Sequence, residues 1–347
     1  MITVAPARLE WWWMAVALAV LAIVATVAIG YGVVPLDAAG IGRSIVDRLP
    51  FVEVDSGFDE RQAAILWSIR LPRVVLGGLV GATLALAGGA YQGSFRNPLA
   101  DPYLLGVAAG AGLGATLAIA YLPASSLPIS PLLMLAFAGA IGGVALTYLA
   151  GYSVKAGRTS VTLILAGVAV AAFLTAIQTY LLQREVATLR QVYGWILGRL
   201  ATVGWTEVLL ILPWVILTAA VVLAGRSRLD VLSVGDEEAK ALGVDPQRVR
   251  LIVVLAATFG TAAVVAVSGL IGFVGIIVPH TIRIVFGTSY KVVLPLSIIY
   301  GAAFLIVCDL IARTLVSPGE LPIGVVTAFF GAPFFAFVLR RSRGVGT

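Results

Sequence analysis

Residues 84–106 read LALAGGAYQGSFRNPLADPYLLG, an apolar run rich in small residues that ends in a polar break with two prolines. The break stands out because 60% of the 347 residues are hydrophobic and only 12% are charged, whereas a soluble domain has about 25% charged residues. A helix that crosses a bilayer needs about 20 apolar residues. The composition therefore indicates an integral membrane protein, and the break predicts where one spanning helix ends and the next begins.

Apolar segments of spanning length recur along the whole chain. The first, residues 11–34, is too long for the apolar region of a cleaved signal peptide and lacks a small-x-small exit, so we expect an uncleaved helix. We predict an all-α integral membrane protein with a single transmembrane domain over residues 1–347 and about ten spanning helices. The segments are 11–34, 63–92, 104–122, 130–152, 160–182, 206–224, 250–270, 272–287, 291–315 and 321–340.

The basic residues gather in alternate loops, and the long loop 36–62 on the other side is mainly acidic. Cytoplasmic loops of membrane proteins carry an excess of lysine and arginine, so we expect these loops and both termini in the cytoplasm. The net charge of +6 includes no basic block that would indicate nucleic-acid binding. The basic loops lie near residues 96, 155, 226–250, 283–291 and 340.

One of these loops, residues 225–250, is long and too polar to enter lipid. Within it GDEEAKALG has a helical composition, and its acidic residues Asp236, Glu237 and Glu238 suit a helix N-terminus. One interpretation is a short amphipathic helix on the cytoplasmic face. The other is a solvated connector.

The sequence lacks the common catalytic motifs. It contains no G-x-x-x-x-G-K-[ST] phosphate loop, no H-E-x-x-H, no cysteine cluster and no G-x-S-x-G. Cys308 is the only cysteine, and His280 is the only histidine. We expect a structural hydrogen-bonding role for His280, with contact to the substrate as the alternative. The carboxylates within predicted spans, Asp309 and Glu207, lie near the ends, whereas ion-coupled carriers need such groups at mid-membrane. We therefore expect the energy for transport to come from another protein.

Residues 84–106 have a weak echo in VAVSGLIGFVGIIVPHTIRIVFG, residues 265–287. Both run from a small-residue helix end through a proline to a closing glycine. In the ten-helix arrangement they enter the membrane from opposite sides, as inverted repeats of transporters do. Chance similarity between two glycine-rich apolar stretches is the alternative.

Six motifs in one order resemble the FecCD-type permease subunits of type II ABC importers, which take up ferric siderophores, haem and cobalamin. The resemblance covers nearly the whole chain from residue 65 onward. The motifs are IRLPRVVLGGLVGATLALAGGAYQGSFRNPLADPYLLGVAAGAGLGA (69–115), LILAGVAVAAF (163–173), VYGWILGRL (192–200), LSVGDEEAKALGV (232–244), SGLIGFVGIIVPHTIRIVFG (268–287) and ELPIGVVTAFFGAPFF (320–335).

The resemblance implies the type II ABC importer permease fold in a homodimer, with the pathway along the two-fold axis. Two separate ATPase subunits, which carry ATP and magnesium, would bind on the cytoplasmic side. A periplasmic or lipid-anchored substrate-binding protein would bind outside, and the location would be a bacterial or archaeal cytoplasmic membrane. The permease itself would do no covalent chemistry and bind no cofactor directly.

The resemblance also implies roles for particular residues. The loop around 225–250 would couple to the ATPase. Arg70 and Arg73 match an R-x-x-R motif that pairs with acidic residues of the binding protein, and Arg313 would join them; snorkelling, or an i, i+4 pair between Arg313 and Asp309, is the alternative. The coupling candidates are Gly235, Asp236, Glu237, Ala239, Leu242 and Gly243.

The cytoplasmic gate of the family matches Asn97 and Leu99 in the N-P-L turn and Thr159 and Ser160 before the fifth span. A departure from the family is Arg199, which stands where many siderophore permeases have serine. This cation could favour an anionic substrate, or bind a lipid or an outer loop.

We therefore predict the permease subunit of an ATP-driven importer of metal chelates, with ferric siderophores as the favoured substrate. Haem and cobalamin stay open as alternatives within the family. An ATP-independent carrier or channel is the alternative of another class, and it would require ionisable residues within the membrane.

Overall fold

The computed structural model describes residues 9–32, 34–48, 50, 54–122, 130–152, 160–200, 204–317 and 319–343, and in these ranges it contains helices and no strand. The elements are α1 (Trp11–Gly30), α2 (Ala38–Asp47), α3 (Glu60–Ile65), η1 (Leu66–Arg70), α4 (Leu71–Phe95), η2 (Pro102–Leu105), α5 (Val107–Tyr121), α6 (Pro131–Tyr152), α7 (Ser160–Arg184), η3 (Val186–Thr188), α8 (Leu189–Ile196), α9 (Thr206–Leu232), α10 (Asp236–Ala241), α11 (Pro246–Ser268), α12 (Val274–Phe286), α13 (Tyr290–Thr314) and α14 (Ile323–Arg343).

The described residues include seven helices long and apolar enough to cross a membrane and three shorter apolar helices. These correspond one to one to the ten predicted segments, so the prediction of an all-α membrane protein with about ten spanning helices is confirmed. The second span is longer than expected, because α3, the π-helical turn η1 and α4 form continuous helix from Glu60 to Phe95.

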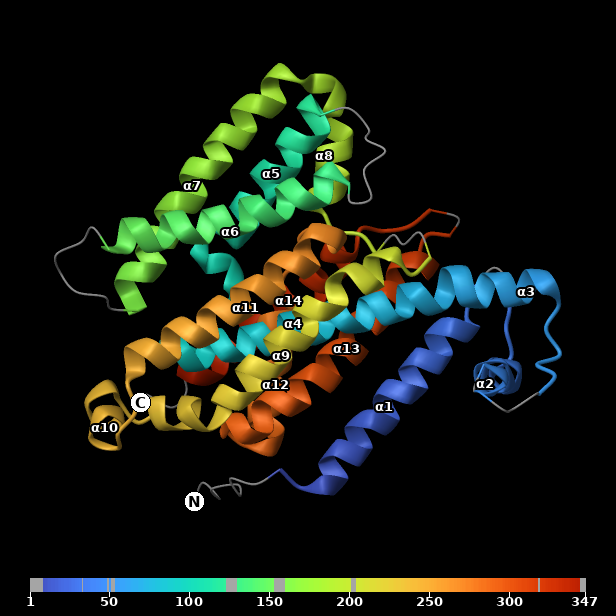
Figure 1. The fold of residues 1–347 in the computed structure, drawn as a ribbon, viewed down its shortest axis with the longest axis horizontal. Coiled ribbons are helices and arrows are strands. Elements are labelled where there is room, and N and C mark those ends of the chain that lie inside the picture. Colours follow the sequence, from blue (N-terminus) through green and yellow to red (C-terminus); the bar gives the residue numbers. More distant parts are fainter. Residues whose placement is uncertain are drawn as a thin grey trace.

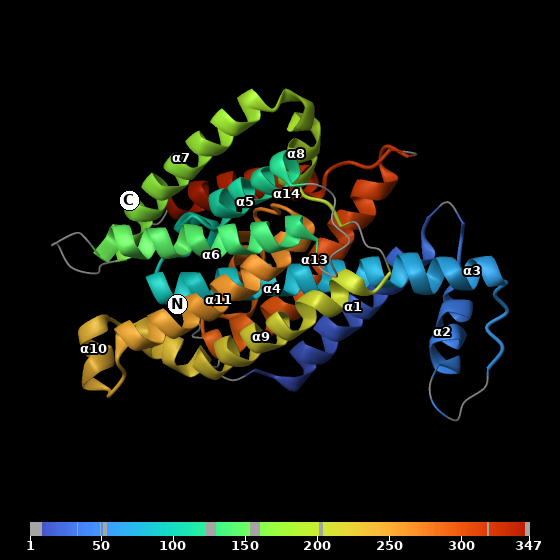
Figure 2. The same cartoon turned by 45° about the horizontal axis from the view of Figure 1, so that its top comes forward.

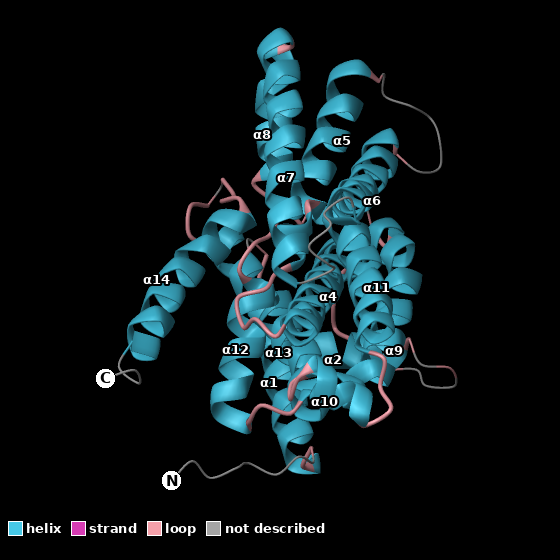
Figure 3. Ribbon diagram, turned by 90° about the vertical axis from the view of Figure 1, so that its left-hand side faces the viewer, coloured by secondary structure: helices cyan, strands magenta, loops and turns pink. Residues whose placement is uncertain are grey.

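Helix α4 is the centre of the molecule, with α9, α11, α12 and α13 packed around it (Figure 3). Its small residues make this possible, because lipid supplies no hydrophobic driving force between helices and close backbone approach must supply the packing. At Gly88 a Cβ atom would collide with the backbone of Gly275 on α12. The composition of residues 84–95 therefore determines which helix lies in the middle.

The remaining helices form two groups beside this centre. Helices α5, α6 and α7 pack on one another, and α6 joins them to α11 (Figure 1). Helix α1 lies against α13 on the other side. Figure 2 shows α14 behind α5 and α11, where it contacts α12 and α13.

Two segments mark opposite ends of the molecule. Helix α10 lies at one end together with the last turn of α14, and α2 and α3 lie at the other (Figures 1 and 2). We call these the α10 end and the α2 end. The chain passes between them along α4, α9, α11 and α13, so a spanning orientation separates the two ends across the membrane.

The two echoing stretches both contain strained backbone. Arg96, at the carboxyl end of α4, has a φ of 50°, and Phe273, at the start of α12, has a φ of 70°. These are the non-glycine residues with positive φ in the described chain. The Phe273 ring occupies the space beside Gly331 of α14, where a Cβ atom would collide with it. In the first stretch the unusual backbone conformation ends α4, and in the second stretch it begins α12.

Candidate functional site

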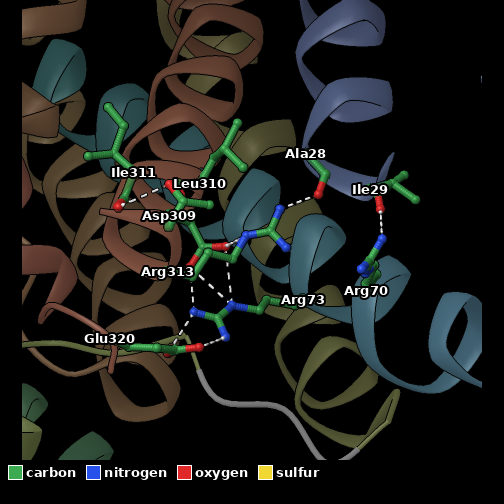
Figure 4. A network of polar contacts seen from close by, with 10 residues as sticks. Ala28, Ile29, Arg70, Arg73, Asp309, Leu310, Ile311, Arg313 and Glu320 are labelled. Carbon is green, nitrogen blue, oxygen red and sulfur yellow. Dashed lines mark hydrogen bonds and ion pairs between the residues drawn. The ribbon is translucent and has the colours of Figure 1, made fainter. Parts of the chain in front are cut away.

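The arginine cluster, Arg70, Arg73 and Arg313, assembles at the α2 end from η1, α4 and α13 (Figure 4). The guanidinium of Arg73 donates to Asp309 Oδ1 from Nε at 3.1 Å and from Nη2 at 2.9 Å. It also donates to Glu320, from Nη1 to Oε1 at 2.8 Å and from Nη2 to Oε2 at 2.9 Å. One arginine therefore holds two carboxylates, one from α13 and one from the turn before α14.

The two carboxylates differ in exposure. The side chain of Asp309 is 4% exposed and that of Glu320 is 54% exposed, with Arg73 between them at 18%. A buried charge without a partner is costly, whereas an exposed pair contributes little. Asp309 is thus the fixed partner of Arg73, and Glu320 is a partner that solvent can replace.

Arg70 and Arg313 instead hold the end of α1. Arg70, only 6% exposed, donates to the carbonyls of Ile29, Gly30 and Val34. Arg313 donates to the carbonyl of Ala28, and its Nε lies 3.7 Å from Asp309 Oδ2. The last carbonyls of a helix have no partner within the helix, so these arginines satisfy them. The i, i+4 pair of Arg313 with Asp309, given above as the alternative to docking, is present.

Docking of a partner on this cluster stays a prediction, but the structure divides the cluster by accessibility. Arg70 is buried and bound to backbone, whereas the Arg73–Glu320 pair faces outward (Figure 4). An incoming carboxylate therefore meets Arg73 and Glu320 first.

Acid should weaken the Arg73–Glu320 pair. The hydrogen bonds from Arg73 hold the pKa of Glu320 below its usual 4.5. A carboxyl group whose pKa is lower in the folded state stabilises the fold above its unfolded pKa, and this contribution is lost as the pH falls through the folded pKa. We expect the melting temperatures of wild type and Glu320→Gln to differ at pH 7 and to converge as the pH falls progressively below 4.5, as measured by a thermal unfolding series.

The coupling segment, residues 235–243, contains α10 at the opposite end of the molecule. Gly235 has a φ of 141°, a backbone conformation that favours glycine at this turn. Ala239 is fully buried and supports the segment from inside. Val234 and Leu242, by contrast, are 60% and 67% exposed, which leaves an apolar surface uncovered.

Asp236 ties this segment to two other elements. Its Oδ1 lies 3.2 Å from Arg96 Nη2, in the break after α4, and 3.2 Å from Arg250 Nη2 on α11. Arg250 Nε also donates to the carbonyl of Ser94 at 2.8 Å. These contacts link α10 directly to the end of α4. Arg250 could not be singled out from the sequence, because nothing local distinguishes it from the neighbouring Arg248.

The break itself is a compact turn. Asn97 Oδ1 accepts the backbone N–H of Leu99 at 2.9 Å, and Asp101 caps η2 by accepting that of Tyr103 at 2.9 Å. The structure thus brings the gate candidates Asn97 and Leu99 together in one Asx turn. Thr159 lies outside the described residues, and Ser160 is the first residue of α7, so their proposed gate role stays a prediction.

Arg199 follows α8, the helix that lies at the end of α7 remote from α10 (Figure 1). Its backbone N–H donates to the carbonyl of Ser268 at 2.8 Å, and its exposed side chain lines a cavity of about 420 Å³ together with that of Arg190. Arg190, which the sequence analysis missed, makes this a site with two cations. His280 is half-buried, and its ring packs edge-on against Phe334 with the centroids 5.9 Å apart.

The described part of the chain contains seven helices long and apolar enough to cross a membrane and three shorter apolar helices, which define a multi-pass membrane protein. The sequence matches the FecCD transport family over residues 8–341, and the chain belongs to this family. It is therefore a permease subunit of an ABC importer and not an enzyme.

Known relatives and one solved structure resemble the chain over most of its length. The cobalamin import system permease protein BtuC of Halobacterium salinarum is 39% identical over 88% of this chain and 82% of its own length. The Fe(3+)-citrate import system permease protein YfmD of Bacillus subtilis is 39% identical over 87% of this chain and 88% of its own. A structure described as an inward-facing metal-chelate type ABC transporter superposes with a TM-score of 0.82 and 30% identity, covering 96% of this chain and all of that one.

Proposed function

We propose that the protein is the permease of an ATP-driven importer of metal chelates, with ferric siderophores as its substrate class. The observation that carries this proposal is α10, which is flanked by the exposed side chains of Val234 and Leu242 and is tied through Asp236 to the break after α4. Such a surface suits a partner that drives the helix from the cytoplasm. The relatives that import ferric citrate and cobalamin support a chelate as cargo.

The proposed assembly is a homodimer in a bacterial or archaeal cytoplasmic membrane, with the pathway on its two-fold axis. Two ATPase subunits bind the α10 end, and a substrate-binding protein docks at the α2 end. Both termini are then cytoplasmic, which agrees with the basic loops at that end. ATP and magnesium belong to the ATPase, and the permease binds no cofactor directly.

The test is uptake of a radioactive ferric siderophore into proteoliposomes that contain the permease with its ATPase and receive the binding protein and ATP. We expect uptake only when all components are present. Uptake without the ATPase would establish an ATP-independent carrier instead. Uptake of cobalamin or haem but not of the siderophore would show that the substrate is another of the chelates that the family imports.

Docking at the α2 end is proposed to proceed by exchange of carboxylates on Arg73. A glutamate of the binding protein would replace Glu320, which is half exposed, while Asp309 keeps its place underneath. The arginine then stays paired throughout, so no buried charge is left without a partner at any stage.

Glu320→Gln is therefore expected to strengthen docking, because it removes the internal competitor. An exposed ion pair contributes roughly 0.2–1 kcal/mol, which corresponds to an affinity about 1.4- to 5-fold higher. The measurement is the dissociation constant of the binding protein at low salt. Glu60→Gln, an exposed acid of α3 at the same end, is the control and should change nothing. A weaker complex for Glu320→Gln would contradict the exchange.

Arg190 and Arg199 are proposed to favour anionic chelates. Two exposed cations on one cavity raise the local concentration of an anion. We expect the double change to glutamine to lower uptake of ferric citrate on the order of 3- to 10-fold while leaving a chelate without net negative charge unaffected. Arg61→Gln, an exposed arginine of α3, serves as the control. Equal effects on both chelates would refute this selectivity.

A further inference from the structure

A second polar cavity lies at the α10 end, separate from the cavity of Arg190 and Arg199. It has a volume of about 600 Å³ and opens between the carboxyl ends of α4, α9 and α12 and the turn that leads into α13. Three cations line it, Arg96, Arg283 and Lys291, with the single carboxylate of Asp230. Asn97 of the break lies on its wall, so the cavity adjoins the proposed gate.

Arg283 is the central cation of this cavity. Its guanidinium donates to Gln92 Oε1, lies 3.5 Å from the hydroxyl of Tyr290 and stacks 5.4 Å from the centre of the Tyr290 ring. No ion pair within the described residues includes it. Neutral partners therefore hold this arginine in place, and its positive charge is left uncompensated.

The acid on the wall is already engaged. Asp230 Oδ2 accepts the hydroxyl of Ser289 at 2.9 Å, and Oδ1 accepts the backbone N–H of Tyr290 at 2.6 Å. It thus caps the first turn of α13, while Arg96 pairs with Asp236 of α10. Lys291, exposed on the rim, takes part in none of the ion pairs of the described residues. An excess of positive charge remains at Arg283 and Lys291.

We propose that this cavity binds a phosphate group, as inorganic phosphate or as the headgroup of an anionic lipid. An arginine fork and a lysine together match the several acceptor oxygens of a phosphate. The hydroxyl groups of Thr288 and Ser289 add polar groups on the same wall. The inference does not depend on which chelate is transported.

Occupancy has a consequence for coupling. Arg96 lines the cavity and also pairs with Asp236, so a bound anion competes with α10 for this arginine. The anion would therefore bias the contact between the break after α4 and the coupling segment.

The first experiment compares thermal unfolding of the detergent-purified permease in potassium phosphate and in potassium chloride at equal ionic strength. We expect phosphate to raise the melting temperature of wild type by several degrees, and Lys291→Gln to weaken its apparent affinity about 5-fold or more. Arg228→Gln, which removes an exposed cation of α9 that does not line the cavity, is the control and should behave as wild type. Arg283→Lys keeps the charge but loses the fork and should also weaken phosphate binding.

The second experiment distinguishes the two sources of the phosphate group. Native mass spectrometry of the permease with phosphatidylglycerol and with an uncharged galactolipid measures which lipid is retained. Preferential retention of phosphatidylglycerol that is lost in Lys291→Gln assigns the site to a lipid headgroup. A phosphate effect in the thermal assay without such retention assigns it to the free anion.

The proposal fails if wild type, Lys291→Gln and Arg228→Gln respond equally to phosphate and retain phosphatidylglycerol equally. It also fails if Lys291→Gln leaves both readouts unchanged but no longer copurifies with the ATPase. In that case the cavity receives a protein side chain and not a phosphate.

Discussion

Asp309→Ala is expected to destabilise the permease by about 3–5 kcal/mol, the cost of removing one partner from a buried ion pair. Asp309 is 4% exposed and lies between Arg73 and Arg313. Without its carboxylate the two guanidinium groups face each other with only Glu320 nearby, and Glu320 is attached to Arg73 from the solvent side. Unfolding in mixed micelles, followed by circular dichroism, measures the loss.

Glu320→Ala is the matched control, since it removes a carboxylate from the same arginine. Glu320 is 54% exposed, so we expect a loss of no more than about 1 kcal/mol. Both variants remove one negative charge beside Arg73, so the difference between their losses of stability measures the effect of burial. If both variants lose the same stability, Arg73 is solvated in the membrane-embedded protein, and the division into a fixed and an exchangeable carboxylate is wrong.

Asp309 also has a role in the position of α1. It orients Arg313, which donates to the carbonyl of Ala28, and Arg70 reaches the next carbonyls of the same helix end. Loss of Asp309 should therefore loosen α1 before the central helices. Faster proteolysis between α1 and α2, with α4 still protected, is the expected pattern in the Asp309→Ala variant.

The number and nature of the helices could be predicted from the sequence, because a membrane span requires about 20 apolar residues whatever it packs against. The central place of α4 follows less directly, from the small residues that permit contacts such as Gly88 with Gly275. The partners of the arginines could not be predicted. Arg73 and Glu320 are 247 positions apart, and they meet because α4 packs against α13 and the connection after α13 folds back onto it through Leu321 and Ala312.

The functional residues that sequence reasoning missed share one property. Arg190, Arg250 and Arg283 look like ordinary loop or helix-end cations, and the distinction lies in their surroundings. Arg250 is 7% exposed and bound to Asp236, whereas the neighbouring Arg248 is largely exposed and pairs only with Asp245. The sequence shows several basic residues close to the acidic N-terminus of a short helix. This pattern does not indicate which of the basic residues is buried.

Leu242→Asp is expected to abolish stable association with the ATPase. Leu242 is 67% exposed at the end of α10, and an apolar anchor of an interface commonly contributes about 2 kcal/mol or more, which corresponds to about 30-fold in affinity. A carboxylate at this position also resists desolvation on binding. Copurification of tagged permease with its ATPase, followed by the transport assay, measures both consequences. Gly235, Asp236 and Gly243 are left intact, so the helix itself should persist.

Val186→Asp supplies the control, because it also places an aspartate at an apolar residue of similar exposure. Val186 is 70% exposed in η3, after α7, on the side remote from α10. We expect this variant to keep its ATPase, because the change lies across the membrane from it. If Val186→Asp loses the ATPase and Leu242→Asp retains it, the orientation is the reverse of the one proposed, and the basic loops lie outside. If neither variant loses the ATPase, the coupling segment is a solvated connector, and the ATPase binds the permease at another surface.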